Sequence, residues 1–445
     1  MSIPSIPSTS FAGADSVILS GMPLSGADRI RASLDHRSPD RVPIDFGSTP
    51  VSGMHVSCVA ALRRHYGMEP RPVKVIEPGQ MLGEIDEELK TAIGIDAEGV
   101  YRRMTRFGFP AVDWKPWRMP DGLEVLVPGR FMTTTDMNGD ILLYPHGDLA
   151  ASPSARMPDG GYFFDSIIRQ LPIEEERLDP RDNLEEFVPI SDEELSHLEK
   201  EVRRVSDTGR AVVANFGGTS FGDIAHIPGS GLKEPRGIRD ISEWYVSIVA
   251  RPDYVRAVFE GQCEIALMNL RRIAARVGNL VDVINICGTD FGTQSSSFCS
   301  VDTFREMWMP YYRRVNEWVH KNTRWRTFKH CCGAIEPFID SFIESGFDIL
   351  NPVQCSATGM EPQHLKQRYG GRIVFWGGGV DTQGVLPFGT PAEVREQVLR
   401  RCKIFSAGGG FVFNTVHNVQ ARTPVENLVA LIDAIHEFNG DAQGE

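Results

Sequence analysis

The chain has 445 residues and carries 46 Lys and Arg against 59 Asp and Glu, which leaves a net charge of −13. Its 41% hydrophobic and 24% charged residues are typical of a globular protein and exclude a disordered chain, a fibrous repeat and a small disulfide scaffold. The acidic balance, without a run of Lys and Arg, argues against nucleic acid or an anionic membrane surface as a partner.

The sequence contains no candidate membrane or export segment. No stretch approaches the length of consecutive apolar residues, about 18, that a membrane-spanning helix needs. Residues 1–24 are rich in Ser, Pro and Gly and contain no Lys or Arg, so we interpret them as a flexible lead and not as a secretory signal. The 8 cysteines follow no regular framework, and we expect reduced thiols in a cytoplasmic protein.

From Ser25 onward the pattern is that of helices alternating with buried strands. Residues 101–175 differ, because Asp-Gly and Asn-Gly turns separate strand-like runs there, and we expect an inserted antiparallel β meander. The elements expected before this insertion are helices at 26–37, 54–66 and 84–93 and strands at 42–47 and 93–100.

After an acidic linker at 172–187, strands and helices alternate to the end of the chain, which predicts βα units and a parallel sheet. The expected strands are Ala211–Phe216, Val281–Cys287, Trp325–His330, Phe347–Val353, Ile373–Trp376 and Phe411–Val416. The expected helices cover 191–207, 240–274, 301–321, 335–345, 361–369, 391–405 and 424–438.

The two early strands and these six give the eight that close a (β/α)8 barrel, and we predict one barrel domain over 25–445 that contains the β meander. The alternative is an open doubly wound sheet. Such a sheet usually carries a G-x-G-x-x-G motif after its first strand, and the sequence has neither this motif nor a P-loop.

In a barrel of this kind the reactive groups lie at the carboxyl ends of the strands. Glycines, which let a ligand approach the backbone, flank nearly all of the polar strand ends in this sequence. These ends carry Asn215, Asp290, the run FKHCCG at 328–333, Asp381 and the run NTVHNVQ at 414–420.

The most specific of these features is the run His330-Cys331-Cys332. Side chains alternate along a strand, so His330 and Cys332 point to one face. His417 ends a different expected strand, on which Phe411, Phe413, Thr415 and His417 share one parity. Together His330, Cys332 and His417 would give three metal ligands and leave a fourth position open, as in a catalytic zinc site.

Each of these candidate site residues also has an alternative interpretation. Cys355, just after another expected strand, competes as the third ligand, and paired cysteines at a strand end are also common as core residues. Asp290 is the acid/base candidate and Asp381 a substrate-orienting one, although either carboxylate could instead cap a helix or a turn. Asn215 and Trp376 are candidate substrate contacts, and Trp376 fits core packing at least as well.

From about Ser25 to Phe438 the sequence resembles the uroporphyrinogen decarboxylase superfamily. This resemblance implies the same barrel that the strand count predicts. The matching pieces are RIRASLDHRSPDRVPIDFG, CGTDFGTQ, FKHCCGAIEPFIDSFIESGFDILNPVQ, LKQRYGGRIVFWGGGVDTQGVLPFGTPAEV and GGGFVFNTVHNVQARTPVENLVAL.

The resemblance also separates two branches of the superfamily. Uroporphyrinogen decarboxylases carry an N-terminal Met-Arg-Gln-Ala-Gly-Arg segment that binds substrate carboxylates, and this sequence has none. Corrinoid-dependent methyltransferases carry a zinc motif of His-x-Cys with a distant Cys. His330 and Cys332 match its first part, and His417 stands where the distant cysteine is expected.

Methyl transfer in this branch implies zinc and a corrinoid. The D-x-H-x-x-G motif of cobalamin-binding domains is missing, since Asp35-His36 has the wrong spacing, so the corrinoid is expected on a separate partner protein. We therefore expect a methyltransferase that moves a methyl group between a small methylated substrate, such as a methoxy-aromatic, and that corrinoid.

Two other readings stay open. The first is a decarboxylase or lyase of the same superfamily that acts on a non-porphyrin carboxylate. The second is a non-catalytic module that binds a corrinoid protein. The sequence also leaves the direction of transfer and the oligomeric state open, with a homodimer as one candidate assembly.

Overall fold

A parallel β-sheet of seven strands forms the centre of the protein in the computed structural model, which describes residues 23–440. The strand order is β15-β14-β13-β12-β11-β10-β3, and all neighbours run parallel. Six of the strands lie within the six ranges predicted after the acidic linker. The bounds are β3 Ala97–Tyr101, β10 Ala211–Asn215, β11 Val283–Cys287, β12 Arg326–His330, β13 Ile349–Asn351, β14 Val374–Trp376 and β15 Phe411–Val412.

The strand predicted at 42–47 is reduced to a single bridge. Ile44 pairs in parallel with Phe413, and the Asp45 amide donates to the Phe413 carbonyl at 2.9 Å. On the other side the Asp96 amide donates to the Ile44 carbonyl at 2.8 Å, just before β3. This short segment therefore joins the two outer strands of the sheet. The strongly curled sheet is consistent with a TIM-like barrel.

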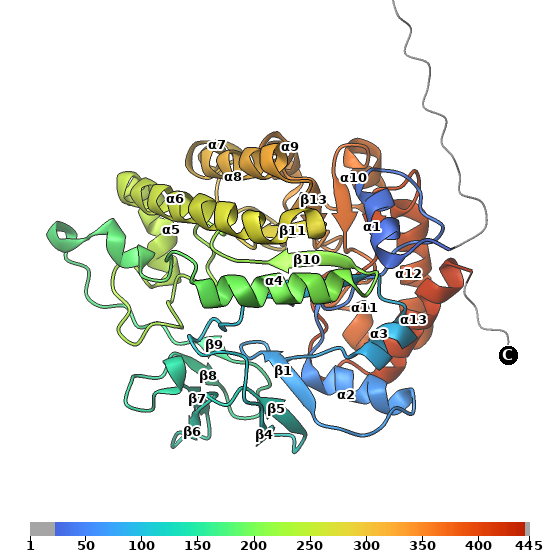
Figure 1. The fold of residues 1–445 in the computed structure, drawn as a ribbon, viewed down its shortest axis with the longest axis horizontal. Helices are drawn as coiled ribbons and strands as arrows, with labels where there is room; N and C mark the ends of the chain where they lie inside the picture. The colour runs from blue at the N-terminus through green and yellow to red at the C-terminus, as the bar shows by residue number, and fades with distance from the viewer. Residues whose placement is uncertain (1–22, 441–445) are drawn as a thin grey trace, which may run out of the picture.

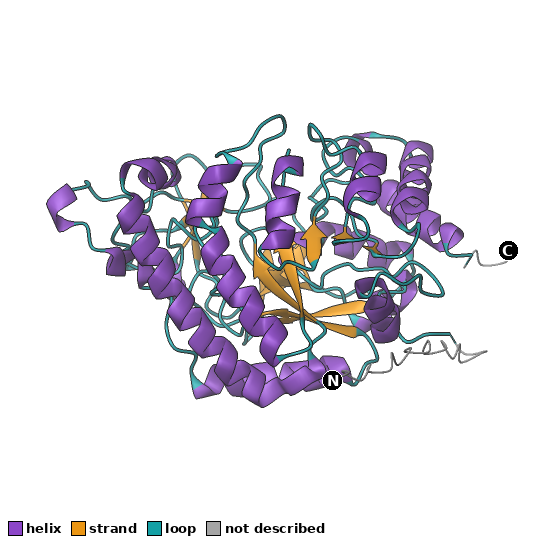
Figure 2. Ribbon diagram, turned by 90° about the horizontal axis from the view of Figure 1, so that it is seen from above, coloured by secondary structure: helices purple, strands orange, loops and turns teal. Residues whose placement is uncertain are grey.

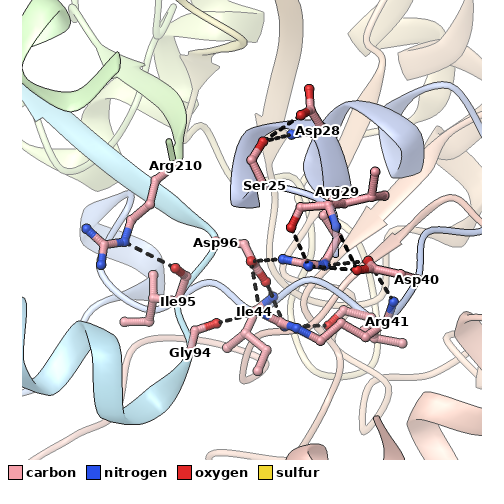
Figure 3. Close-up of polar contacts among 12 residues, drawn as sticks. Ser25, Asp28, Arg29, Asp40, Arg41, Ile44, Gly94, Ile95, Asp96 and Arg210 are labelled. Carbon is pink, nitrogen blue, oxygen red and sulfur yellow. Dashed lines mark hydrogen bonds and ion pairs between the residues drawn. The ribbon is translucent and has the colours of Figure 1, made fainter. Parts of the chain in front are cut away.

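A buried carboxylate holds this segment in place (Figure 3). Asp96 Oδ2 accepts a hydrogen bond from the Ile44 amide at 2.9 Å, and the same carboxylate forms ion pairs with Arg29 at 2.6 Å and Arg41 at 2.9 Å. Asp96 is only 2% exposed, so its charge requires these partners. The contacts tie helix α1 and the bridging segment to the start of β3.

Apolar side chains from alternate strand positions fill the interior of the sheet, as Val213, Val283 and Phe328 illustrate. The buried residues Ala27, Ile30 and Leu34 of helix α1 (Gly26–Leu34) belong to the same interior cluster. Helices enclose the central strands in Figure 2. Because the interior is packed at this level, a ligand site has to lie toward the polar carboxyl ends of the strands.

Apart from the short α11, which was not predicted, the helices lie where the sequence pattern places them, but the helices predicted at 240–274 and 301–321 are each divided in two. The segment predicted as one helix over 240–274 forms two helices, α5 and α6. They are separated at Arg251, because the following Pro252 disfavours helical backbone at Arg251. The helices of Figure 1 are α2 Val56–His65, α3 Glu87–Ile93, α4 Asp192–Ser206, α5 Ile241–Ala250, α6 Pro252–Val277, α7 Val301–Met307, α8 Met309–Asn322, α9 Ile339–Glu344, α10 Pro362–Tyr369, α11 Val385–Phe388, α12 Pro391–Phe405 and α13 Val425–Phe438.

The predicted β insertion is present, at the bottom of Figure 1, as two four-stranded sheets. Its hairpins turn where Asp-Gly and Asn-Gly occur. One sheet also contains β1 and β2, which precede helix α3, and β1 pairs parallel to β5, so the insertion is not the wholly antiparallel meander expected. The orders are β2-β1-β5-β4 and β6-β7-β8-β9, with bounds β1 Val73–Glu77, β2 Leu82–Gly83, β4 Lys115–Arg118, β5 Glu124–Val127, β6 Thr133–Thr135, β7 Ile141–Leu143, β8 Ala155–Met157 and β9 Asp165–Ser166.

The lead predicted for residues 1–24 lies almost wholly outside the described residues. Within residues 23–440, no helix combines the length and apolar character that crossing a bilayer requires.

Candidate metal centre

The side chains of His330, Cys332 and His417 meet in one place. One potential ligand atom from each lies within 4.8 Å of the other two. His330 Nε2 is 3.2 Å from Cys332 Sγ, and the two imidazole rings stand edge to face with centroids 5.3 Å apart. Among the described residues this is the group of His, Cys, Asp and Glu side chains that could hold a metal ion.

The end of β12 provides two of these residues. His330 is the last residue of the strand, and the amide of Cys331 still donates to the Asn351 carbonyl of β13 at 2.7 Å. The contact between the side chains of His330 and Cys332 shows that they lie on one side of the chain, as the alternation predicted. Cys331 points the other way, is 1% exposed, and its sulfur accepts the Phe291 amide at 3.2 Å.

His417 reaches the site by a route that the sequence argument did not predict. The expected strand Phe411–Val416 ends at Val412, which faces the interior, whereas Phe411 and Phe413 pack in the outer core. The parity argument for His417 was therefore wrong. The chain turns away after Phe413, because the Val416 amide bonds to Val380 and the Thr415 hydroxyl to the His417 carbonyl, and this turn carries His417 over His330.

Hydrogen bonds orient both imidazoles. Nδ1 of His330 lies 2.6 Å from the Asn351 side-chain oxygen, and Nδ1 of His417 lies 2.9 Å from that of Asn418. Each Nδ1–H donates to its asparagine oxygen, which leaves the Nε2 lone pair free for a cation. Burial lowers the pKa of His330, and burial together with the neighbouring His330 lowers the pKa of His417 to about 4. Both rings are therefore neutral, the form that binds a metal.

The thiol of Cys332 is protonated in the metal-free protein. Burial and then the Asp290 carboxylate raise its pKa well above the usual value. A metal would have to displace this proton, so its affinity should rise with pH. In a tetrahedral zinc site with bonds of 2.0–2.3 Å, ligand atoms stand roughly 3.4–3.8 Å apart, so a small inward movement of the three groups would suffice.

Asp290 lies next to the candidate ligands. Its Oδ1 accepts the Cys332 amide at 2.6 Å and is 4.0 Å from Nε2 of His330. The side chain is 27% exposed, so the carboxylate faces both the ligands and the solvent-accessible side. This position suits the proton-transfer role predicted for Asp290.

Asn215 lies at the end of β10 and bonds within the protein. Its Nδ2 donates to the Ser48 carbonyl at 2.9 Å, and its Oδ1 accepts from Asn285 at 3.2 Å. Asn285, which the sequence analysis did not single out, has a buried Oδ1 without a partner among the described residues. The amino group and the oxygen of the Asn215 side chain are thus both already hydrogen-bonded, whereas Asn285 keeps an unused acceptor oxygen.

Trp376 and Asp381 both form structural contacts. Trp376 is fully buried, its indole donates to Asp45 at 2.8 Å, and its ring packs edge-on against Phe328. Asp381 Oδ1 accepts the Gln383 amide at 3.2 Å, the bond of an Asx turn before α11. These contacts agree with the alternative interpretations, in which Trp376 is a core residue and Asp381 caps a turn.

Cys355, the competing third ligand, does not join the group of ligand atoms. Its sulfur donates to the Val353 carbonyl at 3.2 Å. Burial raises the pKa of Cys355 to about 11, against the opposing charge of Arg401 nearby. The geometry therefore favours His417 over Cys355.

Lys329 is a buried residue of the site that the sequence analysis missed. It is 0% exposed, and its ammonium donates to the carbonyls of Thr289 at 2.6 Å and His330 at 2.7 Å. It thereby fastens together the ends of β11 and β12, next to Asp290 and His330. A lysine within an apolar strand is rare enough to have marked this position.

The structure thus defines an α/β protein with a curled parallel sheet and a thiol–imidazole site at its carboxyl edge. A model of the family described as Uroporphyrinogen decarboxylase (URO-D) matches residues 175–438. The chain therefore belongs to the uroporphyrinogen decarboxylase family.

Individual relatives are distant. A uroporphyrinogen decarboxylase of Neisseria gonorrhoeae is 23% identical over 249 residues, which are 55% of this chain. The chain spans 63% of the length of that relative. One from Ralstonia nicotianae is 34% identical over 80 residues, 17% of this chain and 21% of the relative.

Among solved structures, a methyltransferase from Methanosarcina mazei aligns with a TM-score of 0.53 at 14% identity. The alignment covers 94% of this chain and 99% of that one. At this level of identity the likeness establishes a shared fold over nearly the whole chain.

Proposed function

We propose that this protein is a zinc-dependent methyltransferase of the demethylase type. It takes a methyl group from a small methylated substrate, such as a methoxy-aromatic, to a corrinoid carried by a separate protein. The observation that carries the proposal is the convergence of His330, Cys332 and His417, whose ligand atoms lie within 4.8 Å of one another. The fold shared with a methyltransferase over most of the chain supports it.

The three residues form a donor set that suits zinc. Thiolate and imidazole favour zinc over magnesium or calcium, and three protein ligands leave one position for the substrate. A zinc ion held there would supply Lewis acidity, which stabilises the negative charge that develops on a leaving oxygen. Asp290, beside Cys332, would deliver a proton to that oxygen, and Asn215 and Asp381 were predicted to orient the substrate.

The corrinoid and its protein are the partners that this reaction requires. The sequence lacks the histidine motif of cobalamin-binding domains, so the proposal places the corrinoid on a second protein that docks at the carboxyl edge of the sheet. We propose a cytoplasmic location, with a homodimer as a candidate assembly. Neither nucleic acid nor a membrane has a role in this scheme.

A decarboxylase acting on another carboxylate is the second candidate. The curated relatives named above favour it, because they are uroporphyrinogen decarboxylases. That reaction needs cationic groups that are free to bind substrate carboxylates. The groups gathered here are imidazoles, a thiol and Asp290, and the ammonium of Lys329 is fully buried and donates to two backbone carbonyls. A module that binds a corrinoid protein without catalysis is the third candidate.

Metal analysis of the purified protein tests the first proposal. We expect one zinc per chain in the wild type and loss of it in Cys332→Ala, since a thiolate ligand cannot be replaced by a methyl group. His417→Ala should weaken zinc retention. Cys355→Ala is the matched control, because Cys355 is a partly buried thiol outside the ligand group, and it should keep its zinc.

Mixing zinc-loaded protein with cob(I)alamin and methoxylated donors should give the methylcobalamin absorption spectrum. Metal-free protein with undiminished activity would refute the zinc proposal. Zinc retention in His417→Ala but not in Cys355→Ala would transfer the third ligand to Cys355. The absence of methyl transfer from a broad donor panel would favour the decarboxylase or the binding module.

A further inference from the structure

Tyr245 has a buried hydroxyl group without a partner. The residue lies in helix α5, which follows β10 in the chain, and its side chain is partly exposed. Its phenolic oxygen is buried and makes no hydrogen bond to any residue within 23–440. A buried tyrosine hydroxyl is normally hydrogen-bonded, and leaving it unpaired is unfavourable. An unpaired hydroxyl of this kind is therefore a candidate ligand contact.

The charge of Asp290, which lies beside the candidate metal centre, influences Tyr245. Burial raises the pKa of Tyr245 to about 12, and the charges of Asp290 and Asp223 add to the effect. Asp290 in turn contacts Cys332 and lies 4.0 Å from His330. The phenol does not hydrogen-bond to Asp290.

The ring of Tyr245 packs on the loop that carries Asp290. It stacks on Phe298 with centroids 5.1 Å apart and planes at 22°. The Phe298 amide donates to the Phe291 carbonyl at 2.9 Å, and Phe291 directly follows Asp290. Phe298 is 45% exposed, so the two stacked rings present an open apolar surface beside the site.

We propose that Tyr245 is a substrate-binding residue that donates a hydrogen bond to the ether oxygen of an aryl methyl ether. The substrate ring would lie against the aromatic surface of Tyr245 and Phe298. This inference rests on the proposed function and narrows its substrate class to methoxy-arenes.

The electron balance explains what the hydroxyl contributes. During transfer the bond between the methyl carbon and the ether oxygen breaks, and its electron pair stays on the oxygen. The electron pair of the new methyl–cobalt bond comes from the cob(I)alamin of the partner protein. Tyr245 keeps its proton, and its hydrogen bond strengthens as negative charge develops on the oxygen. The proton that finally neutralises the phenoxide comes from Asp290 or water.

The first test measures binding without turnover. Tyr245→Phe removes only the hydroxyl, and 4-nitrophenolate serves as the probe because its oxygen corresponds to the leaving group. In calorimetric titrations of metal-free and zinc-loaded protein, the variant should bind the phenolate about 10- to 100-fold more weakly, the range for a hydrogen bond to a charged group. Tyr66→Phe is the control, since Tyr66 is partly buried at the end of α2 and interacts with Asp433.

The second test uses ring-substituted anisoles with cob(I)alamin. The loss of kcat in Tyr245→Phe should be greatest for anisoles whose phenoxide is the most basic and smallest for 4-nitroanisole. A merely structural role would lower all rates equally. The zinc content should not change.

Equal phenolate affinity in Tyr245→Phe and wild type would overturn the inference, as would a rate loss independent of the leaving group. Failure of the protein to retain zinc would instead count against the proposed function. Should methyl transfer be absent altogether, the phenolate affinity alone decides whether Tyr245 binds the oxygen.

Discussion

At the scale of single residues, the environment converts ordinary side chains into metal-binding groups. A solvent-exposed histidine titrates near neutral pH, but burial lowers the pKa of His417 to about 4. The ring is therefore neutral and can donate a lone pair to a metal. The asparagine partners of His330 and His417 complete this preparation, because they hold each ring by Nδ1. Asn418 is the sequence neighbour of His417, whereas Asn351 cannot be recognised from the sequence as the partner of His330, since these side chains meet only across two strands.

Asn351 offers a test of this arrangement. Replacing it with Ala removes the acceptor that orients His330, and loss of such a partner typically weakens metal affinity about 10- to 100-fold. Competition with a zinc chelator measures the change. Asn316→Ala is the control, because Asn316 is equally buried but bonds to the Ser345 carbonyl away from the site. Equal zinc affinity in both variants would mean that Asn351 has no orienting role.

At the scale of elements, ion pairs fasten the surrounding helices to the sheet. Glu98 projects from β3 and is 6% exposed. It pairs with Lys90 of α3 at 2.6 Å and with Arg204 of α4 at 2.9 Å. Burial alone would raise the pKa of Glu98, but Lys90 and Arg204 outweigh it and lower the pKa below its ordinary value. This carboxylate thereby holds two helices against the first strand of the sheet.

The lowered pKa of Glu98 predicts how stability depends on pH. Because the unfolded protein binds this proton more readily, the contribution is complete above the unfolded pKa of about 4.3 and is lost as the pH falls through the lower folded value. Glu98→Gln should cost about 1–3 kcal/mol at neutral pH, since it leaves the largely buried Lys90 ammonium without its anion, whereas the half-exposed Arg204 keeps Glu201 and solvent. Urea unfolding at several pH values checks this. An equal deficit in acid and at neutral pH would contradict it.

At the scale of the whole molecule, the insertion and the barrel share one hydrophobic core. The buried rings of Phe109, Phe131 and Phe164 in the insertion belong to the same cluster as the side chains between the sheet and its outer helices. No separate core isolates the insertion within the described residues. The two parts should therefore unfold together.

Phe131→Ala tests this cooperativity. Phe131 is 1% exposed and makes edge contacts with Phe109, Trp117 and Phe164. Its truncation should cost about 3–5 kcal/mol and shift a single thermal transition. Tryptophan fluorescence and far-UV circular dichroism should report the same midpoint. An early transition of the insertion, with the main transition unchanged, would show that it is an independent unit.

The course of the strands and helices could largely be predicted from local patterns. Apolar runs bounded by predicted helices located β10 to β15, because a strand that is buried on both faces appears in the sequence as a continuous apolar segment. This reasoning did not predict β1, β2 or α11, and it made two strands too long. The segment around Ile44 forms one bridge where a strand was expected, and β15 ends at Val412, because hydrogen bonds to remote residues redirect the chain there.

By itself the sequence determined that His330 and Cys332 face the same way at the end of a strand, since side-chain alternation is a local property of extended backbone. Only the tertiary structure decided that His417, and not Cys355, completes the group. The direction of the His417 side chain is set by a turn, and a hydrogen bond from the Val416 amide to the Val380 carbonyl after β14 holds this turn in place. The tertiary structure also decided that Lys329 is fully buried beside this group and that the Tyr245 hydroxyl has no partner among the described residues, since burial and hydrogen bonding arise only when distant segments pack together.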